Sequence, residues 1–352
     1  MPRASLLLLG LLACACAGPL ERVERARPAM GTEFRVVVYA GDRARAEAAA
    51  EAALARVQDL DRCLSDYDDA SELARLGAAS DAGAPTGWIA LSDDLARVLE
   101  AAQRLARASG GAFDVTAGPY THLWRRARRQ GELPDPARLA AAAGAVGHAR
   151  LELDPERRRA RLGAARMRLD LGGIGKGFAL DEAFAVLARH GLERALVVGG
   201  GELRAGAPPP GERGWRVRLV GLDGASEALL LAHAALATSG DLEQALELDG
   251  RRHSHVLDPR TGLALTERRL VSVVGPSATL TDGLATALSV LGPGAGPELL
   301  VRHPGYAARL QVERGEGMEE RRTPGFPAPL SCGEAPEPPR ASEPRTPAPH
   351  ER

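Results

Sequence analysis

Leu169-Asp170-Leu171-Gly172-Gly173-Ile174-Gly175-Lys176-Gly177-Phe178 is a glycine-rich stretch that joins a predicted strand, 166–171, to a predicted helix, 174–190. It contains the only lysine among the 45 lysine and arginine residues of the chain. Asparagine is absent and isoleucine occurs twice; all three residue types have A/T-rich codons, so a G/C-biased genome has replaced lysine wherever arginine serves. A compact ammonium beside glycines, where backbone can approach a ligand, differs from a planar guanidinium. We therefore interpret Lys176 as a functional cation at a helix N-terminus rather than as a chance survivor.

The same stretch excludes two familiar phosphate-binding motifs. A P-loop requires Gly at the position of Asp170 and Ser or Thr at that of Gly177. A dinucleotide-binding fingerprint counted from Gly173 requires Gly where Phe178 stands. What remains is a carboxylate, a flexible backbone and an ammonium at the start of a helix. That combination suits a phosphate-bearing ligand.

Asp282 and Thr286 form a second group of interest. They are four residues apart on a predicted helix, 277–291, so their oxygens share one face. A carboxylate and a hydroxyl with carbonyls nearby suit a hard cation such as Mg²⁺ that also contacts phosphates. Gly283 costs this helix about 1 kcal/mol relative to Ala, which suggests close packing or coordination. On these residues alone, a solvated Asp and a Thr bonded to its own backbone is an equally good reading.

A third group surrounds His255 and Asp258. His255 could act as an acid or base, although a half-buried structural histidine is the more common case. Asp258-Pro259-Arg260-Thr261-Gly262 is a strong turn signal whatever else it does. Phe and Tyr are scarce in this chain, and Tyr67 or Phe113 beside polar residues could stack on a planar ring.

Composition and pattern restrict the class of protein. The length of 352 residues predicts two domains or one two-lobed unit, and 45% hydrophobic residues suffice for a core. The net charge of −1 argues against a globally basic nucleic-acid binder, so no nucleic-acid partner is predicted. The arginine cluster at 125–129 is interpreted as a solvated helix end. Strands mixed with helices, without regular βαβ alternation, predict an α+β fold with mixed sheets.

Residues 1–17 are predicted to be a lipoprotein signal peptide. Arg3 supplies a positive start, and Leu6–Leu12 is an apolar run too short for a stable membrane span. Leu11-Leu12-Ala13-Cys14 resembles a lipobox, which makes Cys14 the predicted lipid anchor and Cys16 the second candidate. Plain secretion with cleavage near Ala17 is the alternative. The predicted location is therefore the bacterial cell membrane, facing the periplasm.

The ends of the exported chain are predicted to be irregular. Residues 18–29 are polar and are interpreted as a tether. Residues 313–352 are rich in Pro, Glu and Arg without periodicity, which predicts a disordered tail. The remaining cysteines, Cys63 and Cys332, show no paired spacing, so neither a disulfide framework nor a zinc site is predicted.

Taken together, the chain resembles the FAD:protein FMN transferase family, also described as ApbE-type flavin transferases or thiamine biosynthesis lipoprotein ApbE-like proteins. Any one matching element is weak, whereas eight in the right order are specific. The resemblance covers the chain from residue 30 to about 291, and its elements are Met30-Gly31-Thr32, Ser65-x-Tyr67, Gly111-Ala112-Phe113-Asp114, Asp170 to Gly177, Gly199-Gly200, Thr238-Ser239-Gly240, Ser254-His255-x-x-Asp258-Pro259-x-Thr261-Gly262 and Asp282-x-x-Ala285-Thr286.

This resemblance implies a two-lobed, T-fold-related domain over residues 30–312, with FAD bound as a substrate between the lobes and Mg²⁺ at its pyrophosphate. The family transfers FMN to a Thr or Ser hydroxyl of an acceptor protein through a phosphoester bond and releases AMP. The implied acceptors are subunits of sodium-pumping NADH:quinone reductase or Rnf-type complexes. The implied FAD contacts are Met30, Tyr67, Ala112, Phe113, Asp114, Asp170, Lys176 and Val256. The implied metal ligands are Gly173 and Ala285, through their carbonyls, with Asp282 and Thr286.

Three roles and two departures complete the prediction. Lys176 is expected to supply charge to the transferring phosphoryl group, and His255 with Asp258 to activate or orient the acceptor hydroxyl. The family usually has Gly-Gly-Asp where this chain has Gly200-Gly201-Glu202, and often an aromatic residue at the position of Leu242. Two alternatives stay open: a Mg²⁺-dependent FAD pyrophosphatase that yields FMN and AMP, and a non-catalytic flavin-binding lipoprotein.

Overall fold

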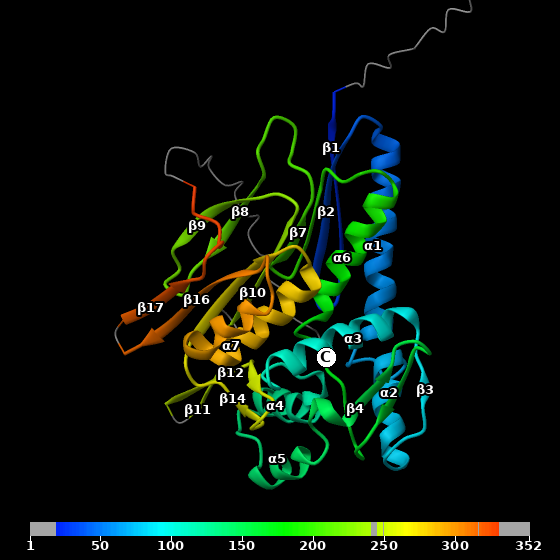
Figure 1. Cartoon of the computed structure of the whole chain (residues 1–352), viewed down its shortest axis with the longest axis vertical. Helices are drawn as coiled ribbons and strands as arrows, with labels where there is room; N and C mark the ends of the chain where they lie inside the picture. Colours follow the sequence, from blue (N-terminus) through cyan, green and yellow to red (C-terminus); the bar gives the residue numbers. More distant parts are fainter. Residues whose placement is uncertain (1–18, 241–244, 249, 316, 331–352) are drawn as a thin grey trace, which may run out of the picture.

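The structure, a computed structural model, describes residues 19–240, 245–248, 250–315 and 317–330. Its main element is an eight-stranded sheet in the order β1-β2-β6-β7-β10-β15-β16-β17 (Figure 1). The strands are β1 Glu21–Ala29, β2 Thr32–Ala40, β6 Ala195–Gly199, β7 Glu202–Ala205, β10 Ala234–Gly240, β15 Arg269–Gly275, β16 Ala307–Arg314 and β17 Gly317–Arg322. The α+β class is confirmed. The expected mixed strand directions are not found, because every strand pairing among the described residues is antiparallel.

Three long helices pack on one face of this sheet: α1 Arg43–Leu64, α6 Gly175–Arg189 and α7 Ala278–Val301 (Figure 1). The alternation of β2 explains the arrangement, since Phe34, Val36 and Val38 enter the core beneath the helices. Val37 points to the opposite face, where it packs against the hairpin of β8 Trp215–Val220 and β9 Ser226–Leu231. The sheet is thus covered on both faces.

A second, mainly helical part lies below the sheet in Figure 1. Its helices are α2 Glu72–Ala78, α3 Asp93–Ala108, α4 Gly118–Gln130 and α5 Pro136–Ala143, with the 3₁₀ turns η1 Ala79–Ala82, η2 Val115–Ala117 and η3 His148–Arg150. A small sheet is formed by β3 Ile89–Ala90, β5 Arg159–Leu162 and β4 Leu151–Asp154, and two further hairpins by β11 Ala245–Leu248 with β12 Arg251–Ser254 and β13 Leu257–Asp258 with β14 Leu263–Ala264. One hydrophobic core continues from α1 into this part, since Leu54, Leu99 and Leu288 belong to the same cluster.

Several helices begin and end where the sequence predicts. A serine before a helical run predicts an N-cap at Ser92, and Ser92 accepts a hydrogen bond from Leu95 N at 3.2 Å at the start of α3. A segment rich in Ala, Glu and Arg predicts a helix over residues 43–64, and α1 has these bounds. α6 matches the predicted 174–190 within a residue. α7 has the length and hydropathy of a membrane span, but 61% of its most apolar window is buried inside the protein, as in a core helix.

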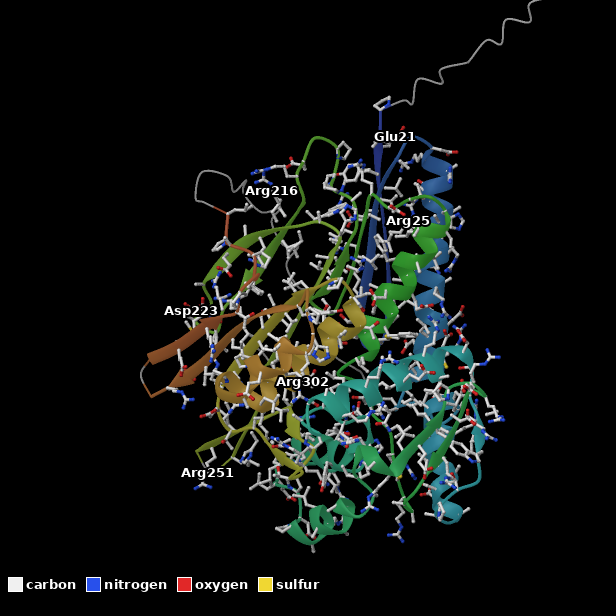
Figure 2. All side chains as sticks on the ribbon, in the orientation of Figure 1. Glu21, Arg25, Arg216, Asp223, Arg251 and Arg302 are labelled. Atoms are coloured by element: carbon white, nitrogen blue, oxygen red, sulfur yellow. The ribbon has the colours of Figure 1, made fainter. Side chains whose placement is uncertain are left out.

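The prediction that residues 18–29 form a tether is wrong for the described part. Residues 21–29 form β1, an edge strand paired with β2 along its whole length. The many charged residues of β1 make its sequence look like a polar linker. In the structure Val23 and Ala29 are buried, and Arg25 pairs with Glu47 of α1 at 2.9 Å. Figure 2 shows Glu21 and Arg25 along this edge.

The predicted tail also begins too early. β16 continues to Arg314 and β17 pairs with it. Charged residues are frequent at the end of β16 and along β17, and cross-strand ion pairs such as Arg309 with Glu320 at 2.9 Å link the two strands. β17 has the composition of a tail because its residues are mostly exposed and charged, and only its pairing with β16 identifies it as a strand. Residues 331–352 and 1–18 lie outside the described residues.

Two shorter predictions are also corrected. The segment 166–171, predicted as a strand, has no strand pairing, and Arg166 adopts a positive φ of 60°. The polar residues Thr238-Ser239-Gly240 predict a turn, but they form the end of β10, where Thr238 and Ser239 pair with β15.

Candidate active site

Two tight hairpin turns meet at one end of the large sheet. Met30-Gly31 joins β1 to β2 with φ values of 50° and 72°, and Gly200-Gly201 joins β6 to β7 with φ values of 61° and 87°. These are the positive angles that two-residue hairpin turns require. β2 pairs with β6, with Phe34 opposite Gly199, so both turns lie at the same end of the sheet. A Cβ on Gly200 would lie 3.1 Å from Lys176 Cδ and 3.4 Å from Thr32 Cγ2, so the second turn lies against both the lone lysine and the start of β2.

Lys176 lies in the first turn of α6 and reaches across to the second hairpin. Its Nζ is 3.0 Å from Glu202 Oε1 and 3.4 Å from the carbonyl oxygen of Gly172. The next residue connects α6 to α7, since Gly177 N donates to Asp282 Oδ2 at 3.0 Å. A Cβ at Gly177 would come within 2.2 Å of Ala278 O, so only glycine permits this crossing of the helices.

The glycine-rich stretch also contacts α7 one turn further along. A Cβ on Gly173 would lie 2.9 Å from Thr286 Oγ1 and 3.3 Å from Phe113 Cε2. The structure therefore brings together three parts of the chain that the sequence singled out separately: the stretch 170–177, the Asp282/Thr286 pair and Phe113. Gly283 is explained by packing, because a Cβ there would be 2.5 Å from Leu105 Cδ2.

Two carboxylates are buried beside this lysine. Asp282 and Glu202 are each 4% exposed. Burial, and then the negative charge of Asp282, raise the pKa of Glu202 to about 8, against the attraction of Lys176. Burial likewise raises the pKa of Asp282 above its usual range. Burial alone would lower the pKa of Lys176, but the charges of Asp282 and Glu202 outweigh it and raise that pKa. We call Lys176, Glu202 and Asp282 the buried charge cluster.

The donors around the cluster suit a hard cation. The described residues hold no group of three or more His, Cys, Asp or Glu side chains placed to bind a metal. The predicted set is instead the Asp282 carboxylate, the Thr286 hydroxyl and the carbonyls of Gly173 and Ala285, all oxygen donors of the type that Mg²⁺ takes. The carboxyl groups fit this use: two of them are buried beside one ammonium, so a second cation would stabilise their charged forms, and Glu202 Oε2 has no hydrogen-bond partner among the described residues.

Tyr67 and Asp170 are linked by an arginine that the sequence did not single out. The Tyr67 ring is 78% exposed, with the Arg125 guanidinium 4.4 Å from its centroid. Arg125 Nη2 is 3.1 Å from Asp170 Oδ2, and Nη1 pairs with Asp66. The cluster 125–129 is therefore only partly the solvated helix end that was predicted. The acidic partners, 45 and 59 residues away, could not be seen as neighbours in the sequence.

Met30, Ala112, Asp114 and Val256 have structural contacts in the described chain. Met30 N donates to Asp61 Oδ2 at 2.8 Å, which holds the first hairpin turn. Asp114 Oδ1 accepts from Thr116 N at 2.8 Å and Thr116 Oγ1 at 2.7 Å, and burial raises the pKa of Asp114. Ala112 and Val256 are buried in one small apolar cluster. Their predicted contacts with a ligand stay predictions.

His255 and Asp258 lie at the end of β12 and in the β13 hairpin. Asp258 accepts from Arg260 Nε at 2.9 Å and Nη2 at 2.8 Å, and also from Arg260 N at 2.9 Å. The predicted turn is therefore confirmed. His255 is half-buried. Leu242, the other departure from the family pattern, lies outside the described residues.

Comparisons with known proteins agree on one family. The profile described as ApbE family matches residues 30–310. Two relatives named FAD:protein FMN transferase are similar over most of their length: one from Treponema pallidum (strain Nichols), 33% identical with 86% of this chain and 88% of that protein covered, and one from Klebsiella pneumoniae (strain 342), 32% identical with 84% and 86% covered.

Solved structures give the same result. The apo form of the Pseudomonas stutzeri flavinyl transferase ApbE has a TM-score of 0.77 and 31% identity, covering 87% of this chain and 96% of that one. The Vibrio cholerae flavin transferase ApbE also has a TM-score of 0.77, with 27% identity and coverage of 88% and 99%.

Proposed function

The chain belongs to the ApbE family, and from this premise we propose that it is an enzyme that transfers FMN from FAD to a Thr or Ser hydroxyl of an acceptor protein. The observation that carries the proposal is the buried charge cluster at the start of α6, where Lys176 lies 3.0 Å from Glu202 beside Asp282. It combines a half-buried ammonium with buried carboxyl groups at a glycine-rich helix N-terminus. Such a site suits a diphosphate better than any neutral group.

The proposed reaction is a displacement at the phosphorus of the FMN half of FAD. The acceptor hydroxyl oxygen forms a bond to this phosphorus, the bond to the bridging oxygen breaks, and AMP leaves with that oxygen. The hydroxyl proton passes to a base, and His255 and Asp258 are the predicted candidates for activating or orienting the hydroxyl. Catalysis of this kind depends on positioning and charge neutralisation more than on covalent help.

Each part of the site has a role in this scheme. Lys176 would contact an oxygen of the transferring phosphoryl group, and Glu202 positions it. The flexible Gly172-Gly173 backbone allows the diphosphate to approach α6. Asp282, Thr286 and the carbonyls of Gly173 and Ala285 would hold Mg²⁺, which when bound neutralises phosphate charge. Tyr67, Phe113 and Asp170 stay predicted contacts of FAD, together with Met30, Ala112, Asp114 and Val256.

One reaction tests the proposal. The purified protein is incubated with FAD, Mg²⁺ and an isolated flavin-acceptor domain, and the acceptor is measured by intact-protein mass spectrometry. We expect a gain of one FMN on a Thr or Ser, and no gain when EDTA replaces Mg²⁺. Free FMN and AMP without an adduct would favour the FAD pyrophosphatase alternative. FAD binding that survives Asp282→Ala, with no turnover under any condition, would favour the non-catalytic flavin-binding lipoprotein.

The cellular setting is part of the same proposal. The acceptors expected from the family are subunits of sodium-pumping NADH:quinone reductase or Rnf-type complexes. We also propose that the protein faces the periplasm on a lipid anchor at Cys14. Because β1 begins at Glu21, the chain from Cys14 to the sheet could extend at most about 24 Å, so the anchored protein would stay close to the membrane. Cys14→Ser should release it from the membrane fraction, and Cys16→Ser should not.

A further inference from the structure

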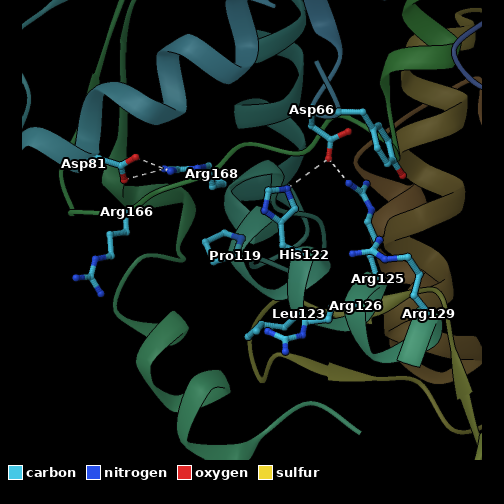
Figure 3. Close-up of a pocket in the computed structure, with 11 residues that line it drawn as sticks. Asp66, Asp81, Pro119, His122, Leu123, Arg125, Arg126, Arg129, Arg166 and Arg168 are labelled. Carbon is cyan, nitrogen blue, oxygen red and sulfur yellow. Dashed lines mark hydrogen bonds and ion pairs between the residues drawn. The ribbon is translucent and has the colours of Figure 1, made fainter. Parts of the chain in front are cut away.

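A basic groove of about 630 Å³ lies beside Tyr67, on the exposed side of α4 (Figure 3). Five arginines and one histidine line it, against two aspartates. We call it the arginine groove; its residues are Asp66, Tyr67, Asp81, Pro119, His122, Leu123, Arg125, Arg126, Arg129, Arg166 and Arg168. The chain as a whole has a net charge of −1, so this excess of positive charge is local.

Internal ion pairs neutralise only part of the groove. Arg168 pairs with Asp81, with Nη1 3.0 Å from Oδ1, and Arg125 pairs with Asp66. By contrast, Arg126, Arg129 and Arg166 are exposed and form no ion pair among the described residues. The hydrogen bond from Arg168 lowers the pKa of Asp81, and Arg166 adds to this effect only through its charge. The nearest partner of Arg126 is the neutral Gln130, which accepts from its Nε at 2.9 Å. The groove therefore offers three free guanidinium groups to a ligand from solvent.

A short chain of contacts connects the groove to the buried charge cluster. Arg125 Nη2 is 3.1 Å from Asp170 Oδ2, and Asp170 Oδ1 accepts from Gly172 N at 2.7 Å. The carbonyl of Gly172 is in turn 3.4 Å from Lys176 Nζ. Tyr67 lines the groove and contacts Arg125. Arg125, which lines the groove, is thus linked through Asp170 and Gly172 to Lys176, where the transferring phosphoryl group is proposed to bind.

We propose that the arginine groove docks an acidic segment of the acceptor protein next to the hydroxyl that receives FMN. This inference rests on the proposed function. The diphosphate of FAD is assigned to the buried charge cluster, and Tyr67 alone among the groove residues is a predicted FAD contact, so the exposed arginines are available to the second substrate. The free arginines of the groove are exposed and come from two elements, α4 and the segment before Asp170. Because the arginines come from two separate elements, they suit an extended peptide with several carboxylates. The attraction between the arginines and these carboxylates would speed and orient the encounter of the two proteins. A water nucleophile would need no such surface.

Charge reversal tests the groove. The variants are the double substitution Arg126→Glu/Arg129→Glu and the single substitution Arg166→Glu. The matched control is Arg189→Glu/Arg218→Glu, which reverses two exposed arginines without ion pairs among the described residues, on α6 and β8. We expect the double variant to raise the KM for the acceptor domain at least about tenfold while the KM for FAD stays within about twofold. The control should change neither.

Two further measurements sharpen the result. Hexaglutamate should inhibit competitively against the acceptor, hexalysine should not, and added salt should weaken the wild-type enzyme more than the double variant. An acceptor domain with its target hydroxyl removed is also titrated by calorimetry, which reports binding without turnover. If the wild type makes no FMN adduct, the proposed function fails, and the calorimetry still decides the groove. An unchanged acceptor affinity, or a KM increase for FAD instead, would overturn this inference.

Discussion

The buried charge cluster and the arginine groove both gather ionisable side chains, yet the two regions differ in how far those side chains are exposed to water. In the cluster, Asp282 and Glu202 are almost fully buried and share a single cation, Lys176. In the groove, Arg126, Arg129 and Arg166 stay exposed. Two unit charges 4 Å apart interact by about 1 kcal/mol in water and by about 4 kcal/mol where the protein lowers the effective dielectric constant. A charge in the cluster can therefore stabilise a bound reactant strongly. A charge in the exposed groove acts mainly on the encounter with a partner.

The difference predicts which measurement each region should change. Substitutions in the cluster should alter the rate of the chemical step, metal binding and the pH dependence of stability. Substitutions near the groove should alter binding and leave stability almost unchanged, since exposed side chains contribute little to it. The four predictions below test this division.

The largest effect is expected from Asp282→Asn. The amide keeps the shape of the side chain and can still accept from Gly177 N, which holds α6 against α7. It removes the one carboxylate of the proposed metal site, so transfer should fall by roughly 10³-fold. Single-turnover transfer measured over a Mg²⁺ titration checks this. Thr286→Ser, which keeps the hydroxyl, is the control; a transfer rate for Asp282→Asn equal to that of the wild type would remove Asp282 from the metal site.

Lys176→Arg should have the next largest effect. The guanidinium retains the positive charge but is larger and planar, and the space is limited because a Cβ on Gly200 would already lie 3.1 Å from Lys176 Cδ. We expect transfer to fall between about 10-fold and 100-fold, with FAD affinity reduced less. Rates measured at saturating FAD do not depend on FAD affinity, so they separate the loss of transfer rate from the loss of binding. Unchanged kinetics would show that arginine serves equally well at this position and that the lone lysine has no special function.

Glu202→Gln should change how stability depends on pH. In the folded chain the pKa of Glu202 is raised to about 8 by burial and by Asp282. The unfolded chain releases this proton near pH 4.5, the usual value for Glu, whereas the folded chain keeps it until about pH 8. The stabilisation is therefore complete below pH 4.5 and is lost as the pH rises toward 8. Urea unfolding of the metal-free protein should show the wild type losing stability over that interval.

The Gln variant supplies the comparison. It cannot ionise at this position, so its free energy of unfolding should fall less between pH 5 and pH 8 than that of the wild type. Glu313→Gln, at an exposed residue of β16, is the matched control and should follow the wild type. Parallel curves for Glu202→Gln and the wild type would mean that Asp282 alone holds the extra proton.

Local signals made some of these residues predictable. Ser92 could be recognised as a cap, and Lys176 stood out against a genome bias, because both depend on neighbours in the sequence. The spacing of Asp282 and Thr286 placed them on one helix face. Their approach to Gly173 involves residues more than a hundred positions apart, and only the motif order of the family suggested it.

Other features depend on contacts that no local pattern reveals. Glu202 was noted as a departure from the family, but its ion pair with Lys176 exists because β6, β7 and α6 meet. β1 was interpreted as a tether because its own residues are mostly polar. Its pairing with β2 and its ion pairs with acidic side chains of α1 make it a strand, and neither is visible in a local pattern. The arginine groove was missed for the same reason: α4 and the segment 166–168 form it together.

The smallest effect is expected at Tyr67, where the two regions meet. The ring is exposed and contacts Arg125, so Tyr67→Ala should change the free energy of unfolding by less than about 0.5 kcal/mol. Loss of a ring that stacks on flavin should weaken FAD binding by about 3-fold to 10-fold. Tyr67→Phe keeps the ring and should bind FAD like the wild type. FAD titration by quenching of flavin fluorescence, beside thermal unfolding, measures both quantities. If Tyr67→Ala raised the KM for the acceptor as strongly as that for FAD, the cluster and the groove would act as one site, and the division between chemistry and encounter would have to be abandoned.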